Sequence, residues 1–194
     1  VDCLNYTTKM MSLYFYFSKS CKLVNELIKK CDISRNHFHK VRGEQWKKIY
    51  QIIAEKYADK TKTWKNVLHW ANTNGYSPKC MKNLLGCYSV EYSTWFYDLP
   101  QIISKNEMVY FLIDKGADWY NGECFWILES YVPELVKILD LLNKTAFLNT
   151  GWSDYYIVSK KFRWIMGFNH HDIISCIGEG LNLNCFNCGK EIIE

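Results

Sequence analysis

The sequence predicts an α+β fold, in which a basic helical first part is followed by a mostly antiparallel β-sheet with one crossover helix. Two observations support this prediction. Large apolar residues recur at helical spacing in the first third of the chain, whereas short apolar or alternating runs separated by turn residues dominate after residue 86. The charge changes at the same place: residues 1–85 carry 16 Lys/Arg against 6 Asp/Glu, and residues 86–194 carry 8 against 14. We therefore divide the chain into residues 1–86 and 87–194, which either fold separately or share one core.

Helical spacing is clearest from Trp46 to Tyr57, where apolar residues recur at i, i+3, i+4, i+7 and i+11. A shorter stripe predicts a helix over Leu23–Lys30, and the basic stretch His37–Gly43 separates the two. We expect further helices over residues 64–71 and from Ser77 to near Gly86. The second of these begins with Ser-Pro, which suits the N-cap and the first helical position.

The second part contains short runs that are rich in β-branched and aromatic residues, as strands usually are. The strands that these runs predict are 87–92, 102–103, 108–113, 124–128, 155–158, 162–168 and 173–177. A helix over Glu134–Leu142, with Pro133 at its first position, separates the fourth strand from the fifth. The last three runs follow one another through short polar turns, which predicts an antiparallel meander.

The composition is typical of a globular protein, with 48% apolar and 23% charged residues. Aromatic residues are abundant (8 Trp, 14 Tyr and 10 Phe), and we expect most of these rings in a core rather than in a ligand cage or a stacking platform. The number of cysteines, nine, is odd, and several lie within apolar runs, which favours reduced core thiols. No run approaches the roughly 18 apolar residues of a membrane span. These features predict a cytoplasmic protein without a membrane segment.

The densest polar cluster of the second part is Asn169-His170-His171-Asp172, at the last turn of the predicted meander. Loops and turns on a rigid sheet often carry functional side chains. Adjacent residues on an extended chain point to opposite faces, so the two imidazoles would not approach one metal ion unless the turn curls. Three interpretations remain open: a structural turn, a binding surface, or a catalytic or metal site.

A second candidate is the pair Cys185 and Cys188, which forms a CxxC followed by Gly-Lys. Two thiolates at this spacing can bind one tetrahedral zinc ion, but a structural site needs two more ligands. The chain has no second CxxC, so the available supplements are Cys176, His170 and His171. The alternatives are a zinc site and a tail with two free thiols. Zinc is the one cofactor that the sequence suggests.

The stretch from Arg35 to Arg42 contains two histidines among basic residues, His37 and His39. Basic residues interleaved with an aromatic ring suit a nucleic-acid backbone. If the stretch is extended, the two histidines share a side and form an alternative metal pair. The chain lacks a phosphate-binding Gly-rich loop, GxSxG, HExxH and an EF-hand, and no catalytic set can be assembled from it.

The segment from Met108 to Gly178 resembles an uncharacterised family of small α+β domains from low-GC bacteria. The matching motifs are MVYFLID, FWILES, DYYIVSKKFRWIM and the NHHD that precedes IISCIG. Members of that family are similar in size and layout to the immunity proteins that bacteria keep against polymorphic toxins. The resemblance implies recurrent positions without an assigned role, and these are Trp164, Asn169, His170, His171 and Asp172.

The sequence favours a non-catalytic, cytoplasmic binding protein of the immunity type. It would present an aromatic-rich sheet and an acidic surface to one toxin-like protein partner. The first alternative is a metal-binding protein or hydrolase that uses His170, His171 or Asp172 with Cys185 and Cys188. The second is a nucleic-acid binder that uses the basic N-terminal helices.

Overall fold

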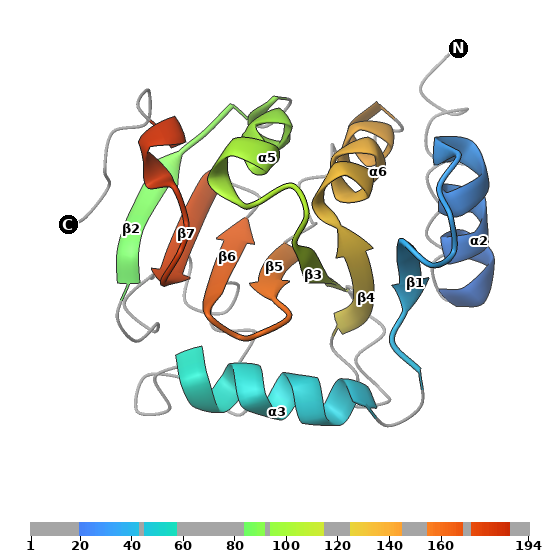
Figure 1. The fold of residues 1–194 in the computed structure, drawn as a ribbon, viewed down its shortest axis with the longest axis horizontal. Helices are drawn as coiled ribbons and strands as arrows, with labels where there is room; N and C mark the ends of the chain where they lie inside the picture. Colours follow the sequence, from blue (N-terminus) through green and yellow to red (C-terminus); the bar gives the residue numbers. More distant parts are fainter. Residues whose placement is uncertain are drawn as a thin grey trace, which may run out of the picture.

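The computed structural model describes residues 20–42, 45–57, 84–91, 94–114, 125–144, 155–168 and 172–186. Within these ranges seven strands form one sheet in the order β1-β4-β3-β5-β6-β7-β2, and every neighbouring pair is antiparallel (Figure 1). The predicted α+β fold is confirmed. None of the helices in these ranges is long and apolar enough to cross a membrane.

The strands are β1 (Phe38–Lys40), β2 (Leu84–Ser89), β3 (Met108–Asp114), β4 (Phe125–Tyr131), β5 (Tyr155–Ser159), β6 (Trp164–Phe168) and β7 (Ile173–Gly178). The α-helices are α2 (Ser20–Cys31), α3 (Gln45–Tyr57), α5 (Leu99–Ile102) and α6 (Val132–Lys144), and the 3-10 helices are η3 (Trp95–Asp98) and η6 (Leu183–Phe186). The predicted helices over 23–30, 46–57 and 134–142 are confirmed, as is the meander β5-β6-β7.

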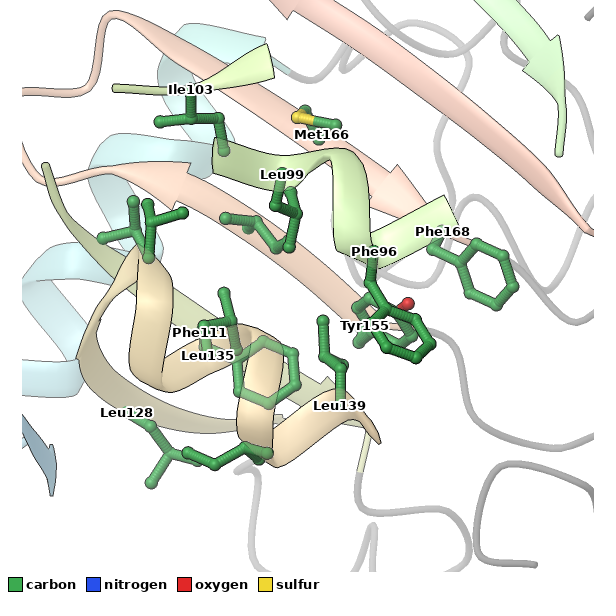
Figure 2. Close-up of a cluster of buried hydrophobic side chains, with 14 of the residues drawn as sticks. Phe96, Leu99, Ile103, Phe111, Leu128, Leu135, Leu139, Tyr155, Met166 and Phe168 are labelled. Carbon is green, nitrogen blue, oxygen red and sulfur yellow. The ribbon is translucent and has the colours of Figure 1, made fainter. Parts of the chain in front are cut away.

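Helices cover both faces of the sheet. Helices α2, α5 and α6 lie on one side and α3 lies on the other (Figure 1). On the first side, Leu135 and Leu139 of α6 pack against Phe111 and Tyr155 of the sheet, as Figure 2 shows. We call this cluster the first core, and the cluster under α3 the second core. Most of the described rings of β3, β5 and β6 lie in these two cores.

The connection from β4 to β5 runs through α6, and β3 lies between these two strands in the sheet. Both strands are antiparallel to β3 and therefore parallel to each other. Joining two parallel strands requires a crossover, which α6 provides over one face. The predicted crossover helix is thus confirmed. Helix α6 follows β4 directly and lies on the same side of the sheet as η3, with which it is in contact.

The amphipathic pattern of α3 explains the second core. Ile49, Ile53 and Tyr57 are buried against the strands, while the other side of the helix faces away from them. The last turn of α3 is fixed at the β5–β6 turn, because the Tyr57 hydroxyl donates a hydrogen bond to the carbonyl oxygen of Phe162 at 2.6 Å. Phe162 has a φ of 52°, a left-handed conformation that a non-glycine residue seldom adopts.

Residues from both sides of the predicted boundary lie in one core. Val24 and Leu27 of α2 belong to the same cluster as Leu135 of α6, and β1 pairs with β4. The boundary that the sequence suggested falls inside β2.

The helix predicted from Ser77 to near Gly86 is wrong at its end, because strand β2 begins at Leu84. The start of that helix and the whole predicted helix over residues 64–71 lie outside the described residues.

The strand predicted at Ile102-Ile103 is wrong, because Ile102 closes helix α5 and Ile103 follows it. Both isoleucines are buried in the first core, so the apolar character was interpreted correctly but the conformation was not. Pro100 lies in the first turn of α5, where its fixed φ favours a helix and its missing N–H costs nothing. The basic stretch around His39 contains a short edge strand, β1, that the sequence did not predict.

Candidate functional site

The turn between β6 and β7 connects Phe168 to Ile173, and its residues Asn169, His170 and His171 lie outside the described ranges. Asp172 is described and has a φ of 60°, a conformation that Asp tolerates better than most residues. Its carbonyl oxygen accepts a hydrogen bond from the Val90 N–H at 2.9 Å. The end of the turn is therefore tied to the segment that leaves β2.

That segment leads into η3, which packs against the strand from which the turn departs. The carbonyl of Glu91 accepts hydrogen bonds from the N–H groups of Thr94 and Trp95, which starts the short helix. The Trp95 ring stacks on Phe168 with ring centroids 5.7 Å apart and on Tyr155 at 6.2 Å. Trp95 is only 5% exposed, so these stacks hold η3 firmly beside the end of β6.

Tyr97 follows two residues later, and its side chain is 48% exposed. It is the large hydrophobic residue that stands out as exposed among the described ones. Its ring lies against Phe96 with centroids 4.6 Å apart, and its hydroxyl donates a hydrogen bond to Asp140 of α6. Asp140 in turn accepts a bond from Lys144 at 2.6 Å. The exposed ring is therefore held at both ends.

These contacts also set the protonation states. The hydrogen bond from Lys144, and next the one from Tyr97, hold the pKa of Asp140 below its usual range. The hydrogen bond to Asp140 raises the pKa of Tyr97, so the phenol stays a neutral donor. The chain Tyr97–Asp140–Lys144 is thus stable around neutral pH. We define the η3 surface as Glu91, Tyr97, Asp98, Asp140, Lys144 and Asp172.

Trp164, which the resemblance singled out, is fully buried in the first core on β6. Its ring N–H is one of the buried polar groups for which the structure contains no hydrogen-bond partner. A contribution of Trp164 to binding would therefore be indirect, through the position of β6 and of the turn that follows. Its role, and those of Asn169, His170 and His171, stay predictions.

The cysteines are placed as follows. Cys185 lies in η6 and packs against the first core, Cys176 is fully buried in β7, and Cys188 lies outside the described residues. Cys31, Cys176 and Cys185 form no disulfide bond in the described part of the chain. Within the described ranges no group of three or more His, Cys, Asp or Glu residues could hold a metal ion. The zinc prediction depends on Cys188, His170 and His171, so it stays a prediction.

The histidines around β1 do not converge on one site. His37 Nδ1 lies 3.1 Å from Glu134 Oε1, whereas His39 Nε2 lies 3.5 Å from Glu129 Oε2. Lys160 also contacts Glu129, with 2.5 Å between Nζ and Oε2. Glu129 and Glu134, two of the acidic residues of segment 87–194, therefore have basic partners within the fold.

A model of one protein family matches residues 21–187, described as a family of unknown function (DUF6756). The chain belongs to this family. The match runs from α2 into the residue after η6, so it is wider than the segment 108–178 on which the resemblance was based. It includes Cys185 and the whole η3 surface, and it ends before Cys188. No curated protein and no solved structure matches the chain.

The η3 surface was missed at the sequence level because its members are far apart in the chain. Tyr97 and Asp140 are separated by 43 positions and meet only through the crossover of α6. The i, i+4 spacing of Asp140 and Lys144 was a detectable helical ion pair, but it does not indicate a ring beside it.

Proposed function

We propose that this chain is a non-catalytic protein-binding module of the immunity type, which binds one toxin-like protein through the η3 surface and the adjacent β6–β7 turn. The observation that supports the proposal best is Tyr97, a large ring that is exposed and yet fixed by Phe96 and Asp140. Tyrosine is enriched among the residues that dominate binding energy at protein interfaces.

The fixed ring matters because ordering a mobile side chain costs free energy on binding, about 0.5–1.5 kcal/mol for a side chain with many rotamers. Because the hydrogen bond to Asp140 already orders the Tyr97 side chain in the free protein, part of this entropy loss does not occur on binding. The ring offers apolar area, and Asp140 beside it offers a carboxylate. A surface of this kind can seat an apolar or cationic group of a partner.

The charge of the η3 surface favours an electropositive partner. The η3 surface contains four carboxylates (Glu91, Asp98, Asp140 and Asp172) and one ammonium group (Lys144), a formal net charge of −3 for these residues. Opposite charge on the partner accelerates association and makes the rate depend on salt. We therefore propose these residues as the acidic surface that the sequence suggested.

Growth of bacterial cells tests this proposal. The candidate toxin is the product of the reading frame immediately upstream of the one that encodes this chain, expressed from an inducible promoter. We expect that product to stop growth when it is expressed alone, and co-expression of the chain to restore growth. Tyr97→Ala should protect less well than the wild type, while Lys48→Ala, on α3 across the sheet, should protect fully.

Two results would count against the proposal. A harmless upstream product that does not bind the chain would remove the immunity function. The double variant Tyr97→Ala, Asp172→Lys changes both the ring and the charge of the η3 surface. If this variant is folded and still protects fully, the η3 surface is not the interface. Circular dichroism and the melting temperature of each variant establish that it is folded.

A further inference from the structure

We propose that the outer side of α3 and the β5–β6 turn form a second binding surface, which takes single-stranded nucleic acid by its phosphate backbone. We call it the α3 surface and define it by Lys47, Lys48, Lys56, Lys161 and Arg163. It lies on the opposite side of the sheet from α5 and α6 (Figure 1), so it is separate from the η3 surface and does not depend on the proposed immunity function.

Helix α3 separates its apolar and basic residues clearly. Its buried side chains point into the second core, and its exposed ones include Lys47, Lys48 and Lys56. Glu55 is the single acidic residue of the helix. Lys48 and Lys56 are eight positions apart, which corresponds to about 12 Å along the helix axis. That length is enough to reach several consecutive phosphates of an extended strand.

The fold adds the β5–β6 turn to this basic helix. The Lys56 ammonium and the Tyr57 hydroxyl both donate hydrogen bonds to the carbonyl of Phe162, which is 106 positions beyond Lys56. Phe162 stands between Lys161, which is exposed, and Arg163, whose side chain is 53% exposed. These two cations are therefore brought to the C-terminal end of α3.

The pairing of charges in this turn indicates which groups face outward. Lys160 contacts Glu129, and it also lies over the Tyr110 ring with Nζ 6.0 Å from the centroid, so it is directed toward the sheet. Arg163 lies 3.7 Å from Glu107, a looser contact that leaves much of the guanidinium accessible. Lys161, between them, is exposed.

Positive charge is concentrated on the described residues of this surface. Helix α3 carries three Lys against one Glu, a net of +2, and the β5–β6 turn adds Lys160, Lys161 and Arg163 without an acidic residue. Segregation of charge of this kind is typical of proteins that bind a polyanion. The small net charge of the whole chain conceals it.

Two aromatic rings favour a single strand over a duplex. Trp46 and Tyr50 are four positions apart on α3, on the same flank, and both are only partly buried. The Lys47 ammonium lies 5.5 Å from the centroid of the Trp46 ring. Unpaired bases can stack on such rings while the neighbouring lysines contact phosphates, whereas the bases of a duplex are already stacked.

Fluorescence anisotropy with a labelled 20-nucleotide oligo-dT tests the proposal. The purified chain should bind at 50 mM salt, and log K should fall against log salt with a slope of about −3 if four phosphates are contacted on a single strand. The triple variant Lys47→Glu, Lys48→Glu, Lys161→Glu should lose more than tenfold in affinity at 50 mM salt. These three side chains are exposed and none of them fixes Phe162, so the fold should persist.

The matched control reverses three exposed lysines elsewhere, Lys29→Glu, Lys30→Glu and Lys105→Glu, and should bind within about threefold of the wild type. The absence of binding at 50 mM salt would overturn the proposal, and so would an equal loss in both triple variants, which would show an effect of net charge alone. Equal or tighter binding of a duplex would overturn the single-strand assignment. Equal binding of poly-glutamate would show that the surface accepts any polyanion and is not built for nucleic acid.

Discussion

Replacing Gly178 by Ala tests whether the close approach of β6 and β7 is as tight as the structure shows. Gly178 ends β7 opposite Trp164 and has a φ of 101°. A Cβ placed there would lie 2.1 Å from the Arg163 carbonyl oxygen and 2.6 Å from Trp164 Cα. Both are backbone atoms, so they cannot rotate away as a side chain would.

The expected cost has two parts. Overpacking of a tight contact costs about 1–3 kcal/mol, and a non-glycine residue at this φ costs a further 1–3 kcal/mol or so. Together they come to about 4 kcal/mol. For a chain of this size each kcal/mol corresponds to roughly 2–4 °C, so the melting temperature of Gly178→Ala should fall by about 8–16 °C.

The variant Gly180→Ala measures the conformational cost without the steric cost. Gly180 also has a positive φ, 88°, but nothing lies within 4 Å of the position its Cβ would occupy. We expect only the conformational cost there, about 1–2 kcal/mol, and a fall in melting temperature of about 2–8 °C. Thermal unfolding of both variants, followed by circular dichroism, gives the comparison. Melting temperatures of the two variants that agree within about 2 °C would refute the contact between Gly178 and β6.

Three further predictions follow from the second core and the thiols. Ile53→Ala, at a fully buried position of α3, should cost about 2–5 kcal/mol in a denaturant titration, and a loss below 1 kcal/mol would contradict the packing of α3 on the sheet. Burial raises the pKa of Tyr57 above its ordinary 10.0, so the folded state keeps this proton while the unfolded chain loses it near pH 10. The contribution of Tyr57 to the free energy of unfolding is therefore complete below pH 10 and decreases as the pH rises above it. The free energy of unfolding of Tyr57→Phe should fall less between pH 9 and 11 than that of the wild type. Equal losses in the two proteins would contradict the burial of the Tyr57 hydroxyl. Elemental analysis of protein purified without chelators should find close to one zinc per chain if Cys185 and Cys188 are ligands, and a content below about a tenth of an equivalent would remove that prediction, because structural zinc is held tightly.

The elements with strong periodic patterns were predictable from the sequence. The stripe from Trp46 to Tyr57 predicts α3 because packing against the strands requires just such a face. The last three strands were predictable because their apolar runs are separated by short polar turns. In these segments the local preference and the tertiary environment favour the same conformation.

The rest depended on contacts that local sequence does not contain. Strand β1 has one apolar residue, Phe38, and is a strand because it pairs with β4. The Ile102-Ile103 pair has β-branched side chains, yet the helical start at Pro100 overrides them. That helices cover both faces of the sheet was also not predicted, because the side on which α3 packs is decided by the whole topology.

The candidate site was predictable only in part. The polar residues before β7 indicated the turn, and Asp172 is indeed tied into the fold by its carbonyl oxygen. The exposure of Tyr97 gave no signal, because the neighbouring aromatic residues, Trp95 and Phe96, are buried. Short 3-10 helices have no clear apolar period, so the exposed and buried rings of η3 cannot be distinguished from the sequence.

The most direct test of the account is the dissociation constant of the complex between this chain and the proposed partner, the product of the reading frame immediately upstream, measured by biolayer interferometry for the wild type and for Tyr97→Ala. We expect Tyr97→Ala to raise the dissociation constant about 30-fold, which corresponds to roughly 2 kcal/mol for a residue that dominates an interface. The association rate of the wild type should also fall as salt rises. A dissociation constant unchanged within twofold, in a variant with wild-type folding, would contradict the account.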